Sequence, residues 1–315
     1  MNKYQLNQSP FYKLSNKKKL AELLFISTKD LKQIQIGNIK NKNKQASNDA
    51  NYRLFVLEDK EKTKKRDIQV PNQFLKKIHK RIANLLSYIE TPEYLHSAIK
   101  NHSYKTNAEV HIGEYSLAKT DISKFFPSTK FQSIFLFFKN TMFCSLDIST
   151  ILAKICTFDQ HLPTGSPLSP ILSFYANKKM FDEIYELCNA NNINFTLYVD
   201  DLTLSGNGCF KIFGKALSII RKYGYKTKTE KDIKYLAGYT KEVTGVIIKN
   251  NELRLPNERY KKIRLLEEQI KNAKEEDKDK LYKELVGRLR EGSQFDKSLN
   301  KKISSICKSN TIFKK

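Results

Sequence analysis

The stretch Phe195-Thr-Leu-Tyr-Val-Asp-Asp-Leu-Thr-Leu-Ser205 decides the fold. Two short runs rich in β-branched and aromatic residues flank Asp200 and Asp201, which predicts a β-hairpin with an acidic pair at its turn. Adjacent carboxylates repel each other and raise each other's pKa, so they stay ionised only beside a cation or ordered donors. Hard oxygen ligands on a rigid hairpin suit Mg²⁺, and the alternative is a solvated Asp-Asp turn.

A third acid, Asp121, ends another predicted strand that begins at Tyr115. The following residues, Ile122-Ser-Lys-Phe-Phe-Pro-Ser128, turn at once into a predicted helix. An acid at the end of a strand, before a tight turn, occupies a position where sheet enzymes place reactive groups. Only folding can bring Asp121 next to Asp200 and Asp201.

The charge of the chain points to a polyanionic partner. The 315 residues contain 57 Lys+Arg against 33 Asp+Glu, a formal charge of +24. Nucleic acid fits this charge better than a membrane, because no apolar run approaches the roughly 20 residues of a spanning helix and no signal peptide opens the chain. The five cysteines are odd in number and form no CxxC, which favours reduced thiols in the cytoplasm over disulfides or zinc.

A charged hairpin and a Gly-containing loop are candidate phosphate sites. Lys65 and Arg66 lead from a charge run into a predicted strand, where they are either phosphate contacts or part of a solvated turn. Leu162-Pro-Thr-Gly-Ser-Pro-Leu-Ser-Pro170 precedes a predicted long helix from Ile171 to Leu187, with Ser169 as its N-cap. This loop either offers backbone N–H groups to a phosphate or simply enters the helix.

The C-terminal part of the chain changes character near residue 256. Before it, Asn250-Asn251 suits the type I′ turn of a hairpin. After it, the chain is charged and helical, which predicts a small basic helical subdomain.

His102 and His111 have no metal-ligand spacing, so packing and hydrogen bonding are the better reading of these side chains. The mixed order of elements predicts an α+β fold, a palm built on an antiparallel sheet.

These motifs together resemble those of a reverse transcriptase, and more narrowly of a bacterial retron reverse transcriptase. Ordered agreement of several motifs over about residues 10–300 is strong where each motif alone is weak. The matching segments are the YxDD box Tyr198-Val-Asp-Asp201, the first-acid box Thr120 to Ser128, the loop Leu162 to Pro170 with Asn177, the lysine box Gly224 to Lys231, the retron NAxxH element Asn107 to His111, and the retron VTG element Val243-Thr-Gly245.

The resemblance implies a right-hand polymerase architecture with fingers, an antiparallel-sheet palm and a helical thumb. Residues 1–50 would be an N-terminal helical extension and loop. Residues 51–115 would be fingers, interleaved with the palm through about residue 185. Residues 116–255 would be the palm with both hairpins, and residues 256–315 the basic thumb.

The resemblance also implies the site. Asp121, Asp200 and Asp201 would be catalytic and would hold two Mg²⁺ ions for an in-line phosphoryl transfer. The expected nucleotide-binding residues are Lys65 and Arg66 at the triphosphate, Phe126 as a steric gate against a ribose 2′-OH, Thr164 and Gly165 in the loop, and Lys231 at the leaving pyrophosphate.

Some of these assignments have alternatives. Phe126 could instead be core, and Lys226 and Lys228 compete with Lys231 for its role. The chain also departs from the family pattern, with Thr164 where Gln is usual and Lys228 where Asn is usual.

The implied partners are dNTPs, an RNA–DNA hybrid and a cognate noncoding RNA that serves as primer and template. The product would be branched RNA-linked single-stranded DNA (msDNA), serving antiphage defence with a separate effector protein. The predicted RNA-binding candidates are Asn107, His111, Val243, Thr244 and Gly245. The alternatives are an abortive-infection or group II intron enzyme, a silent RNA-binding palm scaffold, and a nuclease, for which no His or Glu base stands beside the acids.

Overall fold

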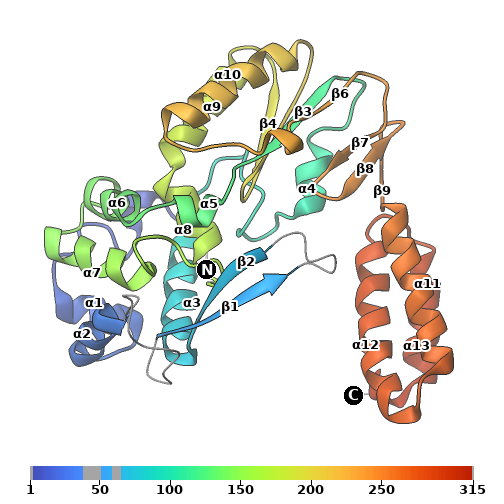
Figure 1. Ribbon diagram of the computed structural model, residues 1–315, viewed down its shortest axis with the longest axis horizontal. Coiled ribbons are helices and arrows are strands. Elements are labelled where there is room, and N and C mark those ends of the chain that lie inside the picture. The colour runs from blue at the N-terminus through green and yellow to red at the C-terminus, as the bar shows by residue number, and fades with distance from the viewer. Residues whose placement is uncertain (1–2, 38–50, 59–64, 314–315) are drawn as a thin grey trace.

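A central antiparallel sheet organises the fold, which is mixed α and β. The computed structural model describes residues 3–37, 51–58 and 65–313 (Figure 1). The sheet has the strand order β4-β5-β3-β6. Its strands are β3 (Leu117–Asp121), β4 (Asn194–Tyr198), β5 (Asp201–Ser205) and β6 (Ile233–Tyr235). The predicted hairpin is confirmed as β4 and β5, which pair in antiparallel register from Asn194↔Ser205 to Tyr198↔Asp201.

Two amphipathic helices cover one face of this sheet. They are α9 (Lys178–Asn189) and α10 (Cys209–Lys222), which lie side by side above the strands in Figure 1. Each repeats its apolar residues at helical spacing, so one face of the helix is buried while the other meets water. This layer makes the sheet a rigid base for the hairpin turn.

The long helix predicted from Ile171 to Leu187 is instead two helices, α8 (Ser169–Ala176) and α9. The break falls at Asn177, whose φ of −119° and ψ of 12° are not helical. Its side-chain amide donates to the Ser173 carbonyl at 2.9 Å and accepts from the Tyr225 hydroxyl at 2.8 Å. A local side-chain hydrogen bond of this kind competes with the helical backbone. Ser169 lies inside α8 and is not its N-cap.

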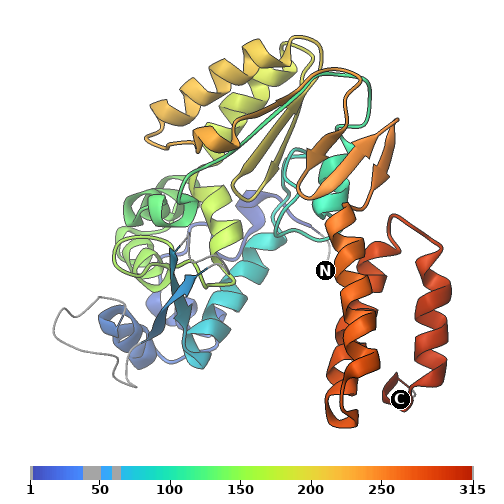
Figure 2. The same cartoon turned by 45° about the vertical axis from the view of Figure 1, so that its right-hand side comes forward.

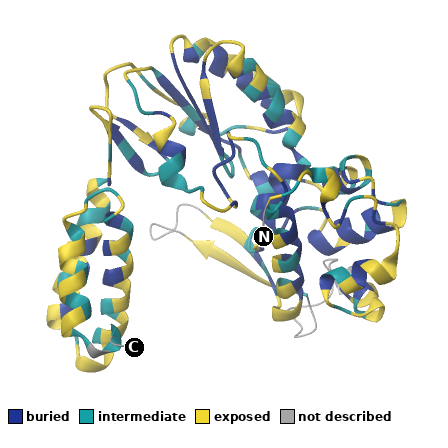
Figure 3. Ribbon diagram, turned by 180° about the vertical axis from the view of Figure 1, so that it is seen from behind, coloured by how far each residue is buried: buried dark blue, intermediate teal, exposed yellow. Residues whose placement is uncertain are grey.

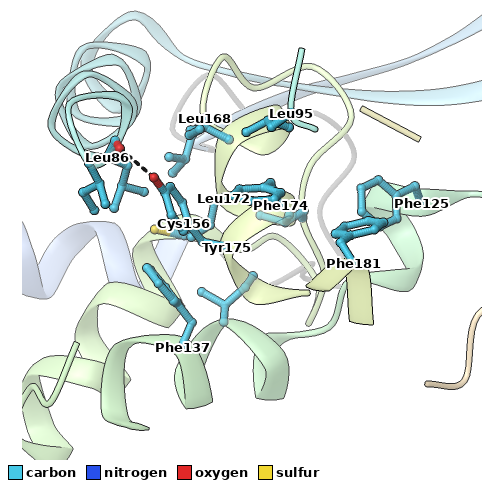
Figure 4. Packing of buried hydrophobic residues seen from close by; sticks show 14 of the residues in the cluster. Leu86, Leu95, Phe125, Phe137, Cys156, Leu168, Leu172, Phe174, Tyr175 and Phe181 are labelled. Atoms are coloured by element: carbon cyan, nitrogen blue, oxygen red, sulfur yellow. Dashed lines mark hydrogen bonds between the residues drawn. The ribbon is translucent and has the colours of Figure 1, made fainter. Parts of the chain in front are cut away.

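The N-terminal helices and the segments around α8 share a single core with the central sheet. In Figure 4, Tyr175 of α8 packs among apolar side chains and donates its hydroxyl hydrogen to the Leu86 carbonyl at 3.2 Å. The surrounding elements are α1 (Lys17–Leu24), α2 (Thr28–Gly37), α3 (Gln73–Ser87), α5 (Phe125–Ser128), α6 (Phe131–Leu136), the π-helical turn Phe137–Thr141 and α7 (Leu146–Cys156). The N-terminal helices are thus part of the main body, and residues 38–50, which belong to the predicted N-terminal extension and loop, lie outside the described residues.

A two-stranded hairpin extends from this body. Strands β1 (Tyr52–Glu58) and β2 (Lys65–Pro71) pair along their whole length. Most of β1 is exposed, as the yellow hairpin in Figure 3 shows. The hairpin is therefore held mainly through the inner end of β2.

The C-terminal part forms a small sheet and a helical bundle. Strands β7 (Lys241–Val243), β8 (Val246–Lys249) and β9 (Glu252–Arg254) lead into α11 (Asn257–Asn272), α12 (Glu275–Gly292) and α13 (Leu299–Ser309). Asn250 and Asn251 both have positive φ, 52° and 60°, as a type I′ turn requires. The three helices have their own core and stand apart from the main body in Figure 2.

Two further predictions concern membrane-spanning helices and the cysteines. None of the helices in the described ranges is long and apolar enough to cross a membrane. All five cysteines are free, and four of them are buried, as the reading of reduced thiols predicts. These thiols are part of the packing.

Buried histidines predict an acid-sensitive fold. Burial lowers the pKa of His79 to about 4 and that of His111 to about 3, from 6.5. Below pH 6.5 these histidines are protonated in the unfolded chain but stay neutral in the folded chain. Their contribution to the free energy of unfolding is therefore complete above that pH and is lost as the pH falls.

We expect the free energy of unfolding to fall by about 2 kcal/mol per buried histidine between about pH 7 and about pH 5. Urea unfolding at a series of pH values measures this slope. His79→Gln and His111→Gln should each make the slope shallower, whatever they do to stability at neutral pH. A slope in either variant that equals the wild-type slope would contradict the assignment for that histidine.

Candidate active site

The three predicted acids meet at one end of the central sheet. Asp121 and Asp201 are directly opposite partners in the antiparallel pair of β3 and β5. Asp200 precedes β5 in the turn, and its carbonyl accepts a hydrogen bond from the Ile122 amide at 2.9 Å. Sheet pairing, and not proximity in sequence, brings Asp121 to the acidic pair.

The turn that carries the acidic pair has a strained backbone. Val199 has a φ of 61°, and a β-branched residue rarely adopts a positive φ. Its amide donates to the Ser97 hydroxyl at 2.9 Å. The segment containing Ser97 lies along β4, because the His96 amide donates to the Leu197 carbonyl at 2.9 Å and the Leu197 amide donates to the Tyr94 carbonyl at 2.7 Å. This segment holds the turn in place.

The electrostatics of the three carboxylates differ. Burial, followed by the charges of Asp121 and Asp201, raises the pKa of Asp200 to about 6. Burial and the charge of Asp121 likewise raise the pKa of Asp201. Asp121 instead accepts hydrogen bonds from the ammonium groups of Lys228 and Lys231, the latter at 2.5 Å. Two of the three carboxylates thus lack sufficient positive charge nearby.

The donor set fits a divalent metal ion. Three carboxylates at one sheet end are hard oxygen ligands, and the raised pKa values of Asp200 and Asp201 show that a cation there would be favourable. In the described part of the chain, no group of three acidic, His or Cys side chains is already arranged to hold a metal ion. The carboxylate of Asp121 is turned to its two lysines. Asp121, Asp200 and Asp201 are the residues that could hold Mg²⁺.

The aromatic pair after Asp121 divides into two environments. Phe125 is buried and its ring packs against Phe181 and Tyr225. Phe126 is half-buried. Phe125 therefore takes the core role, whereas Phe126 packs against the core and keeps part of its surface exposed.

The loop with Thr164 and Gly165 is fastened to β2. The Thr164 amide donates to the side-chain oxygen of Gln69 at 3.0 Å, and the Gly165 amide donates to the Gln69 carbonyl at 3.1 Å. A Cβ on Gly165 would lie only 2.7 Å from that carbonyl, so only glycine fits. Sequence reasoning missed Gln69, because a single Gln in a strand carries no signal of its distant partner.

Lys65 and Arg66 lie on exposed β2. Lys65 forms an ion pair with Glu58 across the hairpin at 2.9 Å. Among the described residues, neither cation forms an ion pair with the three carboxylates. The remaining lysines of the charge run, Lys60, Lys62 and Lys64, lie outside the described residues. A phosphate role for Lys65 and Arg66 stays a prediction.

The predicted RNA-binding candidates meet one another, but three of them are buried. Asn107, in α4 (Tyr104–Glu109), donates to the Thr244 hydroxyl at 3.3 Å. His111 bridges the hydroxyls of Ser205 and Thr196 at 2.8 and 2.7 Å. Asn107, His111 and Val243 have at most 1% of their surface exposed, so their contacts in this structure are internal, and a role in RNA binding stays a prediction. Thr244 and Gly245 are half-buried and stay candidates.

Comparison with known proteins identifies the family of this chain and its relatives within that family. The family model described as "Reverse transcriptase (RNA-dependent DNA polymerase)" matches residues 57–248, and the chain belongs to this family. Its curated relatives are retron enzymes. It is 30% identical over 221 residues to the Retron Ec86 reverse transcriptase of Escherichia coli, a match that covers 69% of each chain. It is 30% identical over 211 residues to the Retron Se72 reverse transcriptase of Salmonella heidelberg (strain 579083-10), covering 66% of this chain and 52% of that relative.

Solved structures are more distant. A foamy viral protease-reverse transcriptase in complex with double-stranded DNA has a TM-score of 0.47 at 17% identity, covering 83% of this chain and 40% of that one. A telomerase from Candida albicans has a TM-score of 0.48 at 11% identity, covering 79% and 56%. Both scores are below 0.5, so the family assignment rests on the sequence matches. They identify the chain as a retron reverse transcriptase, an RNA-directed DNA polymerase.

The strained turn predicts a positioning role for Ser97. Ser97→Ala removes the acceptor of the Val199 amide, and leaving a partly buried donor unsatisfied costs about 1–3 kcal/mol. We expect a loss of this size in urea unfolding, together with a larger fractional loss of primer extension, because the acidic turn shifts. Ser87→Ala is the matched control, since its hydroxyl bonds only locally to the Asn84 carbonyl. Equal activity in the two variants would rule out the role.

Proposed function

We propose that this chain is the RNA-directed DNA polymerase of a retron, using a cognate noncoding RNA as both primer and template. The product is branched RNA-linked single-stranded DNA (msDNA), made in the cytoplasm and serving antiphage defence with a separate effector protein. Support comes from the kinship with retron enzymes and from the NAxxH and VTG elements, which contact each other through Asn107 and Thr244.

The observation that carries the catalytic proposal is the convergence of three carboxylates on paired strands. Asp121, Asp200 and Asp201 would hold two Mg²⁺ ions. Such ions, when bound, stabilise the charge on the attacking and leaving oxygens of a phosphoryl transfer. The strained turn at Val199 and the helices behind the sheet fix the carboxylates before substrate binds.

The nucleotide site is proposed beside these acids. Phe126 would exclude a ribose 2′-OH through its exposed edge, and the loop with Thr164 and Gly165 would border the incoming nucleotide. Lys231 is favoured over Lys226 for the pyrophosphate, because its ammonium group already reaches the acidic site, where it bonds Asp121.

The wider architecture is proposed to follow the right-hand polymerase plan. Residues 51–115 would be fingers, interleaved with the palm through about residue 185, and Lys65 and Arg66 on the hairpin would meet the triphosphate. Residues 116–255 would be the palm, and 256–315 the thumb. A chain with a charge of +24 would track the RNA template and the RNA–DNA hybrid largely through phosphates and shape.

The test is expression of the chain from its native locus, followed by denaturing gel analysis of total nucleic acid with and without RNase. We expect a discrete single-stranded DNA whose mobility shifts after RNase, and which is absent for Asp200→Ala/Asp201→Ala. If that DNA is missing but the purified protein extends a primer on poly(rA), the retron product is wrong while the polymerase stands. Failure of both assays would leave a silent scaffold.

The aromatic pair predicts separate effects of two substitutions. Phe126→Ala should let the enzyme incorporate ribonucleotides, lowering the preference for dNTPs over rNTPs by about a hundredfold with little loss of stability. Phe125→Ala should instead cost about 3–5 kcal/mol of stability, because that ring is buried. Single-nucleotide incorporation with each nucleotide type measures the preference. An unchanged preference in Phe126→Ala would exclude the gate.

A further inference from the structure

The segment that follows α10 is attached to the end of β3 by backbone as well as side-chain bonds. The Lys228 amide donates to the Asp121 carbonyl at 3.1 Å, and the Lys231 amide donates to the Lys228 carbonyl at 2.7 Å. The Ser123 amide donates to the Lys226 carbonyl at 2.7 Å. Backbone hydrogen bonds therefore place Lys228 beside Asp121, within reach of that carboxylate for its ammonium group.

The contact between Lys228 and Asp121 is sheltered. The side chain of Asp121 is 6% exposed and that of Lys228 is 29% exposed. An ion pair that is mostly removed from water is screened much less by salt and solvent than a surface pair. Lys228 therefore supplies real charge compensation at the acidic site.

The charge of Lys228 reaches all three carboxylates. Lys228 bonds Asp121 directly, Asp201 lies opposite Asp121 in the paired strand, and the Asp200 carbonyl accepts from the amide of the residue after Asp121. A metal ion that binds the same carboxylates must take over Asp121 from this ammonium group.

We propose that Lys228 is a positioning residue that serves as an internal counter-cation: it holds the Asp121 carboxylate in place before divalent ions bind and competes with them for it. This inference rests on the proposed function of the three acids as metal ligands. Lys231 shares the contact with Asp121, but its side chain is 44% exposed. Lys228 is the more enclosed of the two cations.

The proposal predicts opposite changes in metal affinity and in metal-free stability. Without Lys228, a divalent ion displaces only the ammonium group of Lys231 from Asp121 and meets one positive charge fewer. Without Lys228 and without metal, three neighbouring carboxylates share less positive charge, so their repulsion destabilises the fold. A residue that merely fills space would lower both quantities or neither.

The experiment measures Mn²⁺ binding to the full-length protein by electron paramagnetic resonance, with no nucleotide present. The variants are Lys228→Asn, which restores the usual amide, and Lys228→Met, which keeps the bulk of the stem without the charge. Lys226→Asn is the matched control, because it removes one positive charge from an exposed side chain two residues away. Asp200→Asn/Asp201→Asn defines which binding belongs to the acidic site.

We expect both Lys228 variants to bind Mn²⁺ about tenfold more tightly than the wild type, as loss of a nearby unit charge predicts. In EDTA, the melting temperature of Lys228→Met should fall, and added Mn²⁺ should restore it. Lys226→Asn should match the wild type in both measurements. Mn²⁺ affinities within twofold of the wild type in both Lys228 variants would overturn the counter-cation role.

The two proposals fail in different ways. If wild-type protein shows no Mn²⁺ binding that is lost in Asp200→Asn/Asp201→Asn, the acids are not metal ligands and the proposed catalytic function falls with the inference. If that binding is present but insensitive to Lys228, only the counter-cation role is wrong. A rise in affinity in Lys226→Asn equal to that in Lys228→Asn would also overturn the role, because bulk charge would then explain the effect.

Discussion

Repulsion among three carboxylates at one end of a sheet is the constraint on which the rest of the structure depends. Asp121 and Asp201 face each other across paired strands, and Asp200 is next to them in a strained turn. Left alone, this arrangement would open or take up protons, as the raised pKa of Asp200 shows. Strand pairing, the helix layer behind the sheet and the ammonium groups bonded to Asp121 together hold it closed.

The central sheet is linked to the C-terminal helices through α4. From α4 onward, His111 fixes β4 and β5 from the face away from the helix layer, and Asn107 bonds the turn between β7 and β8. At the start of α4, the Tyr104 hydroxyl donates to Glu291, which also accepts from Arg259 at 2.6 Å. The two motifs therefore connect the sheet, α4 and the C-terminal helices through hydrogen bonds.

Local patterns made much of this predictable. Three local patterns each determine the backbone conformation of their own segment, so the sequence alone could place them. They are the alternating apolar residues beside the acidic pair, the acid at a strand end, and the Asn-Asn turn. The packing role predicted for His111 is confirmed, but the break at Asn177, the fastening of Thr164 by Gln69 and the particular hydrogen-bond partners of His111 could not be predicted. Each depends on a partner far away in the chain, which only the folded structure supplies. The predicted long helix was wrong for this reason.

The C-terminal helices follow from a different balance of forces. Their core contains few buried residues, Ile263, Leu266, Ile270, Leu285 and Leu289, and they contact the main body mainly near α4. A small core with few anchoring contacts opens or pivots at lower cost than the central body. The sheet that carries the acids is thus the rigid part of the molecule, and the C-terminal helices are the part that can move at lower cost.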